Sequence, residues 1–187
     1  MPVKGEQTSQ QKRPAERKFR HEQKYYITRA EYELISRKLA LTMDRDRFAL
    51  KSGKYFIRSL YFDDYMNSAI EEKLAGNDDR SKYRIRTYNM KDTVIKFERK
   101  SKTGPFIEKQ SISLSRAECD AILHGQYGVL LRRREPFAKE LYAAFRLRAL
   151  KPCVLVDYWR EAYVFALEDV RVTFDTDIRT AHRATDL

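Results

Sequence analysis

The sequence predicts an α+β fold, an antiparallel β-barrel with flanking helices. Segments rich in strand-forming residues place their charges at alternate positions, as at Lys82, Arg84 and Arg86. Residues i, i+2 and i+4 of a strand point to one face, so these cations share a side. Seven such segments are joined mostly by short turns, which favours antiparallel pairing. Because nearly every segment has one polar face, the most economical arrangement is a curled sheet or barrel with a wet, charged interior.

Composition indicates a folded, basic domain. The chain has 187 residues, 42% of them hydrophobic, and a formal net charge of +11. Residues 1–18 are rich in Gln, Lys, Ser and Pro without periodicity, so we expect a disordered leader before a domain at 19–187. The first twenty residues hold six Lys or Arg against two Glu, so most of the net charge belongs to the domain. A basic domain implies an anionic partner: nucleic acid, phosphates or a membrane surface.

Cysteine usage and hydropathy bear on the compartment. Cys119 and Cys153 are the only cysteines and lie far apart, which is typical of free thiols in a reducing cytosol. No run approaches the roughly 18 apolar residues of a membrane span, and the N-terminus lacks the apolar stretch of a signal peptide. We therefore expect a cytoplasmic domain without a membrane span, which leaves a membrane-bound partner open.

Alternation and capping signals define the first elements. Thr28 and Glu31 have the spacing of a capping box, which predicts a helix directly after the first strand. Asn67 is expected to cap a short helix that ends before Gly76. Strands are predicted at 19–27, 54–63, 81–89 and 93–101, and the short helix at 68–75.

The second half of the chain repeats these signals. After a Thr-Gly-Pro turn, a strand is predicted at 106–114. Ser115 and Glu118 form a second capping-box signal, for a helix that ends at Gly125. A further helix is predicted at 136–150, followed by strands at 153–165 and 170–175. Residues 176–187 are polar and unlike a strand.

Charged residues gather on single strand faces. Glu22 and Lys24 lie two apart, so the carboxylate could hold a divalent metal and the lysine a phosphate oxygen, although a solvated ion pair has the same spacing. Arg84 and Arg86 could bind phosphates, or form a cationic edge that discourages aggregation. Arg58 stands among apolar and aromatic residues. We expect it on the face of the arginine pair, either paired in the core or facing a ligand.

Other charged groups extend this pattern. Lys96, Glu98 and Lys100 share a face, and Arg160 and Arg171 lie on the last two strands. Four acidic residues could neutralise the cations or bind metal, and spacing leaves both readings open: Glu108, Asp157, Glu161 and Asp175. The chain has no P-loop, GxGxxG, HExxH or GxSxG motif. Phosphoryl transfer assisted by cations and a metal needs no covalent nucleophile and fits this set.

Six segments occur in a particular order along the chain. They read FRHEQKY at 19–25, RSLYFDD at 58–64, KYRIRTY at 82–88, KFERK at 96–100, VDYWREAY at 156–163 and VRVTFD at 170–175. In this order they resemble the VTC domain, the polyphosphate polymerase branch of the CYTH-like triphosphate tunnel metalloenzymes. The resemblance implies a closed barrel whose tunnel binds the phosphates of ATP. It also implies transfer of the terminal phosphate to polyphosphate, with Mn²⁺ or Mg²⁺.

The resemblance assigns roles to individual residues. It implies Lys24, Arg84, Arg86 and Lys100 as phosphate-binding residues that act in catalysis. Lys96, which shares the face of Lys100, is expected to bind phosphate without a catalytic role. Three further arginines are implied to bind phosphate: Arg58, Arg160 and Arg171. The expected metal ligands are Glu22 and, after it, Glu98.

One departure from the family pattern affects the expected activity. The family's last strand carries a Glu-x-Lys-type motif, and none appears before Leu187. We therefore expect a barrel that lacks its last strand or strands, with weakened metal binding and catalysis. A polymerase with ATP and polyphosphate as partners is the leading hypothesis. A triphosphatase of the same fold, or a non-catalytic module for polyphosphate or inositol phosphates, is the alternative. Nucleic acid is disfavoured, because Glu22 and Glu98 would repel its backbone unless a metal intervened.

Overall fold

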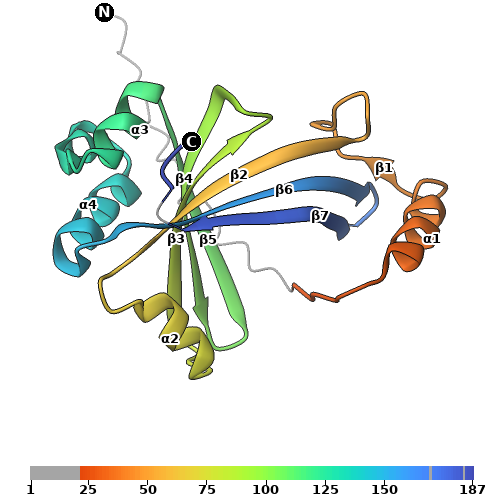
Figure 1. Cartoon of the computed structure of the whole chain (residues 1–187), viewed down its shortest axis with the longest axis horizontal. Helices are drawn as coiled ribbons and strands as arrows, with labels where there is room; N and C mark the ends of the chain where they lie inside the picture. Colours follow the sequence, from red (N-terminus) through yellow and green to blue (C-terminus); the bar gives the residue numbers. More distant parts are fainter. Residues whose placement is uncertain (1–21, 169, 183) are drawn as a thin grey trace, which may run out of the picture.

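A seven-stranded antiparallel sheet organises the molecule (Figure 1). The computed structural model describes residues 22–168, 170–182 and 184–187, so the predicted leader lies outside the described residues. The sheet order is β1-β6-β2-β3-β4-β5, and β7 pairs with β6. The strands are β1 (Asp44–Arg45), β2 (Lys54–Asp63), β3 (Arg80–Tyr88), β4 (Lys91–Thr103), β5 (Phe106–Leu114), β6 (Lys151–Phe165) and β7 (Val170–His182).

The sheet curls strongly. In Figure 1, β2, β6 and β7 run across the view while β3, β4 and β5 turn away from them. The result is a half-barrel, in which β5 and β7 do not pair with each other within the described part of the chain. The helical elements are α1 (Arg29–Leu39), α2 (Ser68–Leu74), α3 (Arg116–Leu123), the 3-10 helix η1 (Tyr127–Arg132) and α4 (Pro136–Arg148). The predicted α+β class, antiparallel and with flanking helices, is confirmed.

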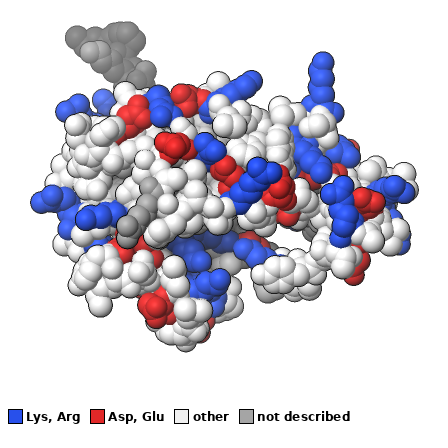
Figure 2. Space-filling view, viewed as in Figure 1, with Lys and Arg blue, Asp and Glu red and all other residues white. Residues whose placement is uncertain are grey.

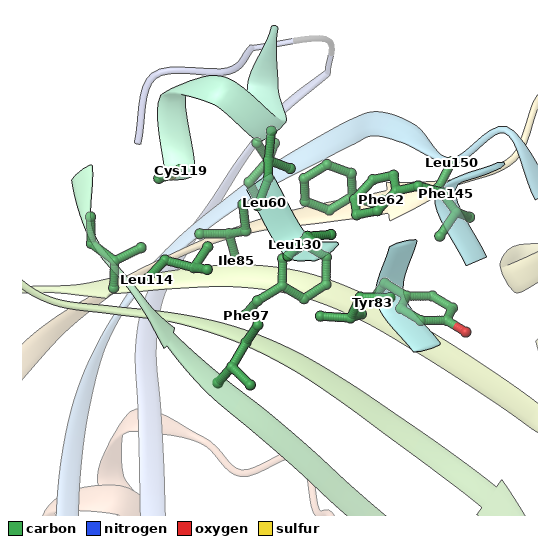
Figure 3. Packing of buried hydrophobic residues seen from close by; sticks show 14 of the residues in the cluster. Leu60, Phe62, Tyr83, Ile85, Phe97, Leu114, Cys119, Leu130, Phe145 and Leu150 are labelled. Atoms are coloured by element: carbon green, nitrogen blue, oxygen red, sulfur yellow. The ribbon is translucent and has the colours of Figure 1, made fainter. Parts of the chain in front are cut away.

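One face of the sheet is covered by helices and forms the main core (Figure 3). Phe62, Ile85 and Phe97 of the sheet pack against Leu130 of η1 and Phe145 of α4, and all five are buried. Full burial of such a side chain is worth about 1.5–3 kcal/mol. Because the helices seal this face with apolar side chains, the alternate residues of β3 and β4 are left on the other face.

The first predicted strand is wrong over its described part. Residues 22–28 have no regular secondary structure, and all are exposed. Alternation of charge places side chains on faces only where a neighbouring strand supplies hydrogen bonds, and none pairs with this segment among the described residues.

The predicted caps have different outcomes. Both capping boxes are present, with Thr28 and Ser115 each accepting a hydrogen bond from the backbone N–H three residues on. Asn67 holds the predicted N-cap position of α2, but its side chain makes no capping bond and its φ is 55°. Asp64 Oδ1 instead accepts from the backbone N of Ser68 at 3.0 Å, and Asp63 Oδ1 from that of Ala69 at 3.1 Å.

The last strand is longer than predicted. β7 continues to His182 and pairs residues such as Arg179 with Asp157 of β6, so the expectation of a non-strand after residue 175 is wrong for 176–182. Backbone hydrogen bonds hold this edge strand, and its exposed side chains can therefore be polar.

Candidate polyanion-binding site

Strand register gathers the cations on the face that the helices leave uncovered. Arg84 lies opposite Tyr61 and Glu98, and Arg86 lies opposite Ser59 and Lys96. Partners across adjacent strands share a face. Figure 2 shows Lys and Arg atoms recessed between α2 and the segment that leads to α1. The strands place on this face Lys82, Arg84, Arg86, Lys96, Lys100, Lys109, Arg160 and Arg171.

Glu98 lies at the centre of these cations. Its Oε2 receives Arg84 Nε at 2.8 Å and Arg84 Nη2 at 2.7 Å. Lys109 Nζ lies 2.5 Å from the other oxygen, and Arg86 Nη1 is 3.9 Å from Oε2. Burial alone would raise the pKa of Glu98, but the charges of Arg84, Arg86 and Lys109 lower it to about 2. Glu98 is therefore a buried anion that holds three cations together.

Hydroxyl groups orient the two central arginines. Arg86 is buried and donates to Ser59 Oγ at 3.0 Å and to the Tyr158 hydroxyl at 2.9 Å. Arg84 Nη1 donates to the Tyr61 hydroxyl at 3.0 Å. The Arg84 charge helps to lower the pKa of Tyr61 against the opposing effect of burial. These bonds fix both guanidinium planes, which favours repeatable contacts with an anion.

Four residues of this arrangement were not identified from the sequence: Ser59, Tyr61, Lys109 and Tyr158. Lys109 and Ser111 lie two residues apart on β5 and therefore share a face. In the sequence this was only a weak signal of a polar face. Its pairing with Lys100, and hence its position beside Glu98, depends on register.

Arg160 and Arg171 lie on the predicted face and are already ion-paired. Arg160 donates to both oxygens of Asp175, at 2.6 and 2.7 Å, and its bond to Asp175 raises its pKa although burial opposes this. Arg171 donates to the Tyr55 hydroxyl at 2.9 Å and pairs with the buried Asp46. A ligand here would meet charges that are largely compensated.

The expectation that Arg58 shares the face of the arginine pair is wrong. Arg58 lies opposite Thr87 of β3 and Asp157 of β6, one position out of phase with Ser59, the partner of Arg86. It donates to both oxygens of Asp157, at 3.0 and 2.8 Å, and to the Asp186 carbonyl at 2.9 Å. The strand period of two residues puts Arg58 on the side of the helices and pairs it there.

The remaining predicted ligands lie at the edge of the basic face. Glu22 of the irregular segment pairs with Lys100 and lies 3.5 Å from Lys24 Nζ. These cations lower the pKa of Glu22, although burial opposes them. Lys96 is half-buried beside Arg86. The structure thus brings Lys24 and Lys100 together through Glu22, while Lys96 lies beside Arg86, near the cations around Glu98.

Among the described residues, the acidic side chains do not gather into a metal site. No group of three or more His, Cys, Asp or Glu side chains with that potential occurs among the described residues. Glu98 is enclosed by cations, and Asp157 and Asp175 pair with arginines. Glu161 accepts from Tyr32, Ser36 and Tyr163 at 2.5–2.9 Å. Such a donor set does not fit the several oxygen ligands that Mn²⁺ or Mg²⁺ prefers.

The helices are too short or too polar for a bilayer: none in the described part of the chain is fit to cross a membrane.

Comparison with a solved structure shows a shared fold. A candidate adenylate cyclase from Bacillus halodurans matches with a TM-score of 0.52 and 13% sequence identity, over 86% of this chain and 78% of that one. The likeness is that of the CYTH-like tunnel fold. A candidate adenylyl cyclase from Hippeastrum, described as having a dominant triphosphatase activity, matches with a TM-score of 0.48 and 12% identity. That match covers 80% of this chain and 68% of the other.

Sequence comparison identifies the family. No curated protein matches the chain by sequence. The family model of the VTC domain, however, matches residues 19–187. Because this match spans most of the chain and agrees with the fold and the basic face, the protein belongs to the VTC-domain family.

Proposed function

We propose that this protein binds ATP through its triphosphate on the basic face and transfers the terminal phosphate to a polyphosphate chain. The observation that carries the proposal is the convergence of Arg84, Arg86 and Lys109 around Glu98, on the sheet face opposite η1 and α4. Membership of the VTC-domain family supports a triphosphate ligand. A row of oriented cations suits a reaction in which positioning and charge stabilisation supply most of the catalysis.

Individual residues have different parts in this proposal. Arg86, held by Ser59 and Tyr158, would present a fixed guanidinium to the phosphates. Lys96 lies beside it, has no ion pair with another described residue, and would add a positive charge. Lys24 and Lys100 would have to exchange Glu22 for phosphate. Arg160 and Arg171 would contribute less to phosphate binding, because Asp175 and Asp46 already pair with them.

A metal ion is part of the family-based expectation and would add positive charge at the phosphates. Glu22, the more exposed of the two predicted ligands, remains the proposed contact. The described residues do not provide a full ligand set, so the proposal assigns no step to a metal.

The test is incubation of purified protein with ATP and Mn²⁺ or Mg²⁺, followed by gel analysis of the products. Acid-labile chains longer than triphosphate are expected. ADP and free phosphate without longer chains would instead identify a triphosphatase, and tight phosphate binding without turnover would identify a binding module. Arg84→Ala should abolish the polymer. Arg132→Ala, which removes an exposed charge from η1 on the helical side, is the control.

A further inference from the structure

The cationic row on β3 extends beyond the cluster around Glu98. Arg86, Arg84, Lys82 and Arg80 occupy alternate positions. At about 3.3 Å per residue, the row from Arg86 to Arg80 is about 20 Å long. Lys100 and Lys102 of β4 lie opposite Lys82 and Arg80. The row therefore leads away from Glu98 toward the end of the sheet where α2 packs on β3.

Lys82 is surrounded by other positively charged side chains. It is half-buried, and none of the hydrogen bonds or ion pairs of the described residues includes it. Burial lowers its pKa, and the charges of Lys73, Arg80 and Lys24 lower it further. Like charges this close repel one another, so binding of an anion beside Lys82 would reduce the repulsion.

Two lysines of this region, Lys73 and Lys82, are available to bind an anion. Lys102 is paired with Asp78 at 2.7 Å, and Arg80 Nη1 donates to the Asn77 carbonyl at 2.8 Å. Lys73 of α2 is exposed and has no ion pair among the described residues. The backbone N–H groups of Ser68 and Ala69, at the start of α2, donate to the side chains of Asp64 and Asp63. These bonds hold α2, and with it Lys73, beside the start of β3.

We propose that Lys73 and Lys82, flanked by Arg80, form a second phosphate-binding surface, which holds the part of a linear polyphosphate that extends beyond the triphosphate-sized site. This inference rests on the proposed function, because it assumes that phosphates occupy the cluster around Glu98. A short triphosphate at Arg84 and Arg86 leaves Lys73 and Lys82 uncovered, whereas a longer chain continues along the row. The further phosphates would meet Lys73 and Lys82, which have no carboxylate partner within the described part of the chain.

The test measures dissociation constants for inorganic triphosphate and for a long polyphosphate, by titration calorimetry at fixed ionic strength. The wild type should bind the long chain more tightly per chain than triphosphate, by about tenfold or more. The Lys73→Ala/Lys82→Ala variant should lose this gain, so that its affinity for the long chain falls by a clearly larger factor than its affinity for triphosphate. The single variant Lys82→Arg should keep the gain in affinity, because the positive charge remains.

The control is Arg132→Ala/Arg134→Ala, which also removes two exposed positive charges, but from the helical side. It should keep the gain with chain length. The inference is overturned if the wild type shows no gain, if the control loses it equally, or if the lysine variant weakens both ligands alike. ATP turnover is measured separately: polyphosphate binding without polymer synthesis would refute the proposed polymerase and leave the second surface in place.

Discussion

Arg84 and Glu98 are register partners on adjacent strands, and two nitrogens of Arg84 contact one carboxylate oxygen of Glu98, at 2.8 and 2.7 Å. Glu98 is only 1% exposed. A buried carboxylate among cations stabilises the protein only while its partners remain, because an unpaired buried charge is costly. This pair therefore links the stability of the sheet to the geometry of the basic face.

Replacing Glu98 by Gln should destabilise the protein. The amide keeps the shape of the carboxylate but removes the charge that holds Arg84, Arg86 and Lys109 together, which should cost about 3–5 kcal/mol. Denaturant unfolding followed by circular dichroism measures this change. Glu168→Gln, at an exposed turn, serves as control and should stay within about 0.5 kcal/mol of the wild type. Equal stabilities of the two variants would contradict the role given to Glu98.

The contribution of Glu98 should depend on pH. Its pKa in the folded protein is about 2, below the ordinary value of 4.5. The folded state therefore binds this proton less readily than the unfolded state. The stabilisation is complete above pH 4.5 and is lost as the pH falls toward 2. The difference in unfolding free energy between wild type and Glu98→Gln should shrink over that window. A difference that stays constant from pH 6 to 3 would show that the carboxylate charge does not matter.

Replacing Arg58 and replacing Arg84 by Ala should have different effects on triphosphate affinity. Arg84→Ala should weaken triphosphate binding by about 1–3 kcal/mol, the cost of losing a charged donor. Arg58→Ala should leave that affinity within about twofold, because Arg58 pairs with Asp157 on the other face of the sheet. It should still lower stability, since Asp157 loses its partner. Calorimetric titration with triphosphate and thermal melting of both variants separate the two effects.

Removing one hydroxyl should loosen α1. The Tyr32 hydroxyl donates to Glu161 Oε2 at 2.5 Å, while Ser36 and Tyr163 bond to Oε1. Tyr32→Phe leaves Oε2 buried without that donor, at a cost of about 1–3 kcal/mol. Hydrogen exchange should show faster exchange of the α1 amides. Tyr65→Phe, an exposed tyrosine, should change neither stability nor exchange.

Sequence patterns predicted most of the local structure. Strands appear where alternation and turns indicated them, and β2 and β5 match their predicted bounds. Both capping boxes form because they depend on residues three apart. The errors arose where long-range pairing decides. Residues 22–28 alternate in charge without a strand partner, and β7 continues through polar residues because β6 offers its backbone.

The sequence alone determined that cations would line one face of β3 and β4, because side chains alternate along any strand. It also determined the family, through six segments in order. Only the tertiary structure decided which charges meet. Register brought Lys109 beside Glu98, put Arg58 on the opposite side against Asp157, and set Lys82 opposite Lys100. The physical reason is that cross-strand pairing is set by contacts distant in sequence, and a shift of one residue reverses every face.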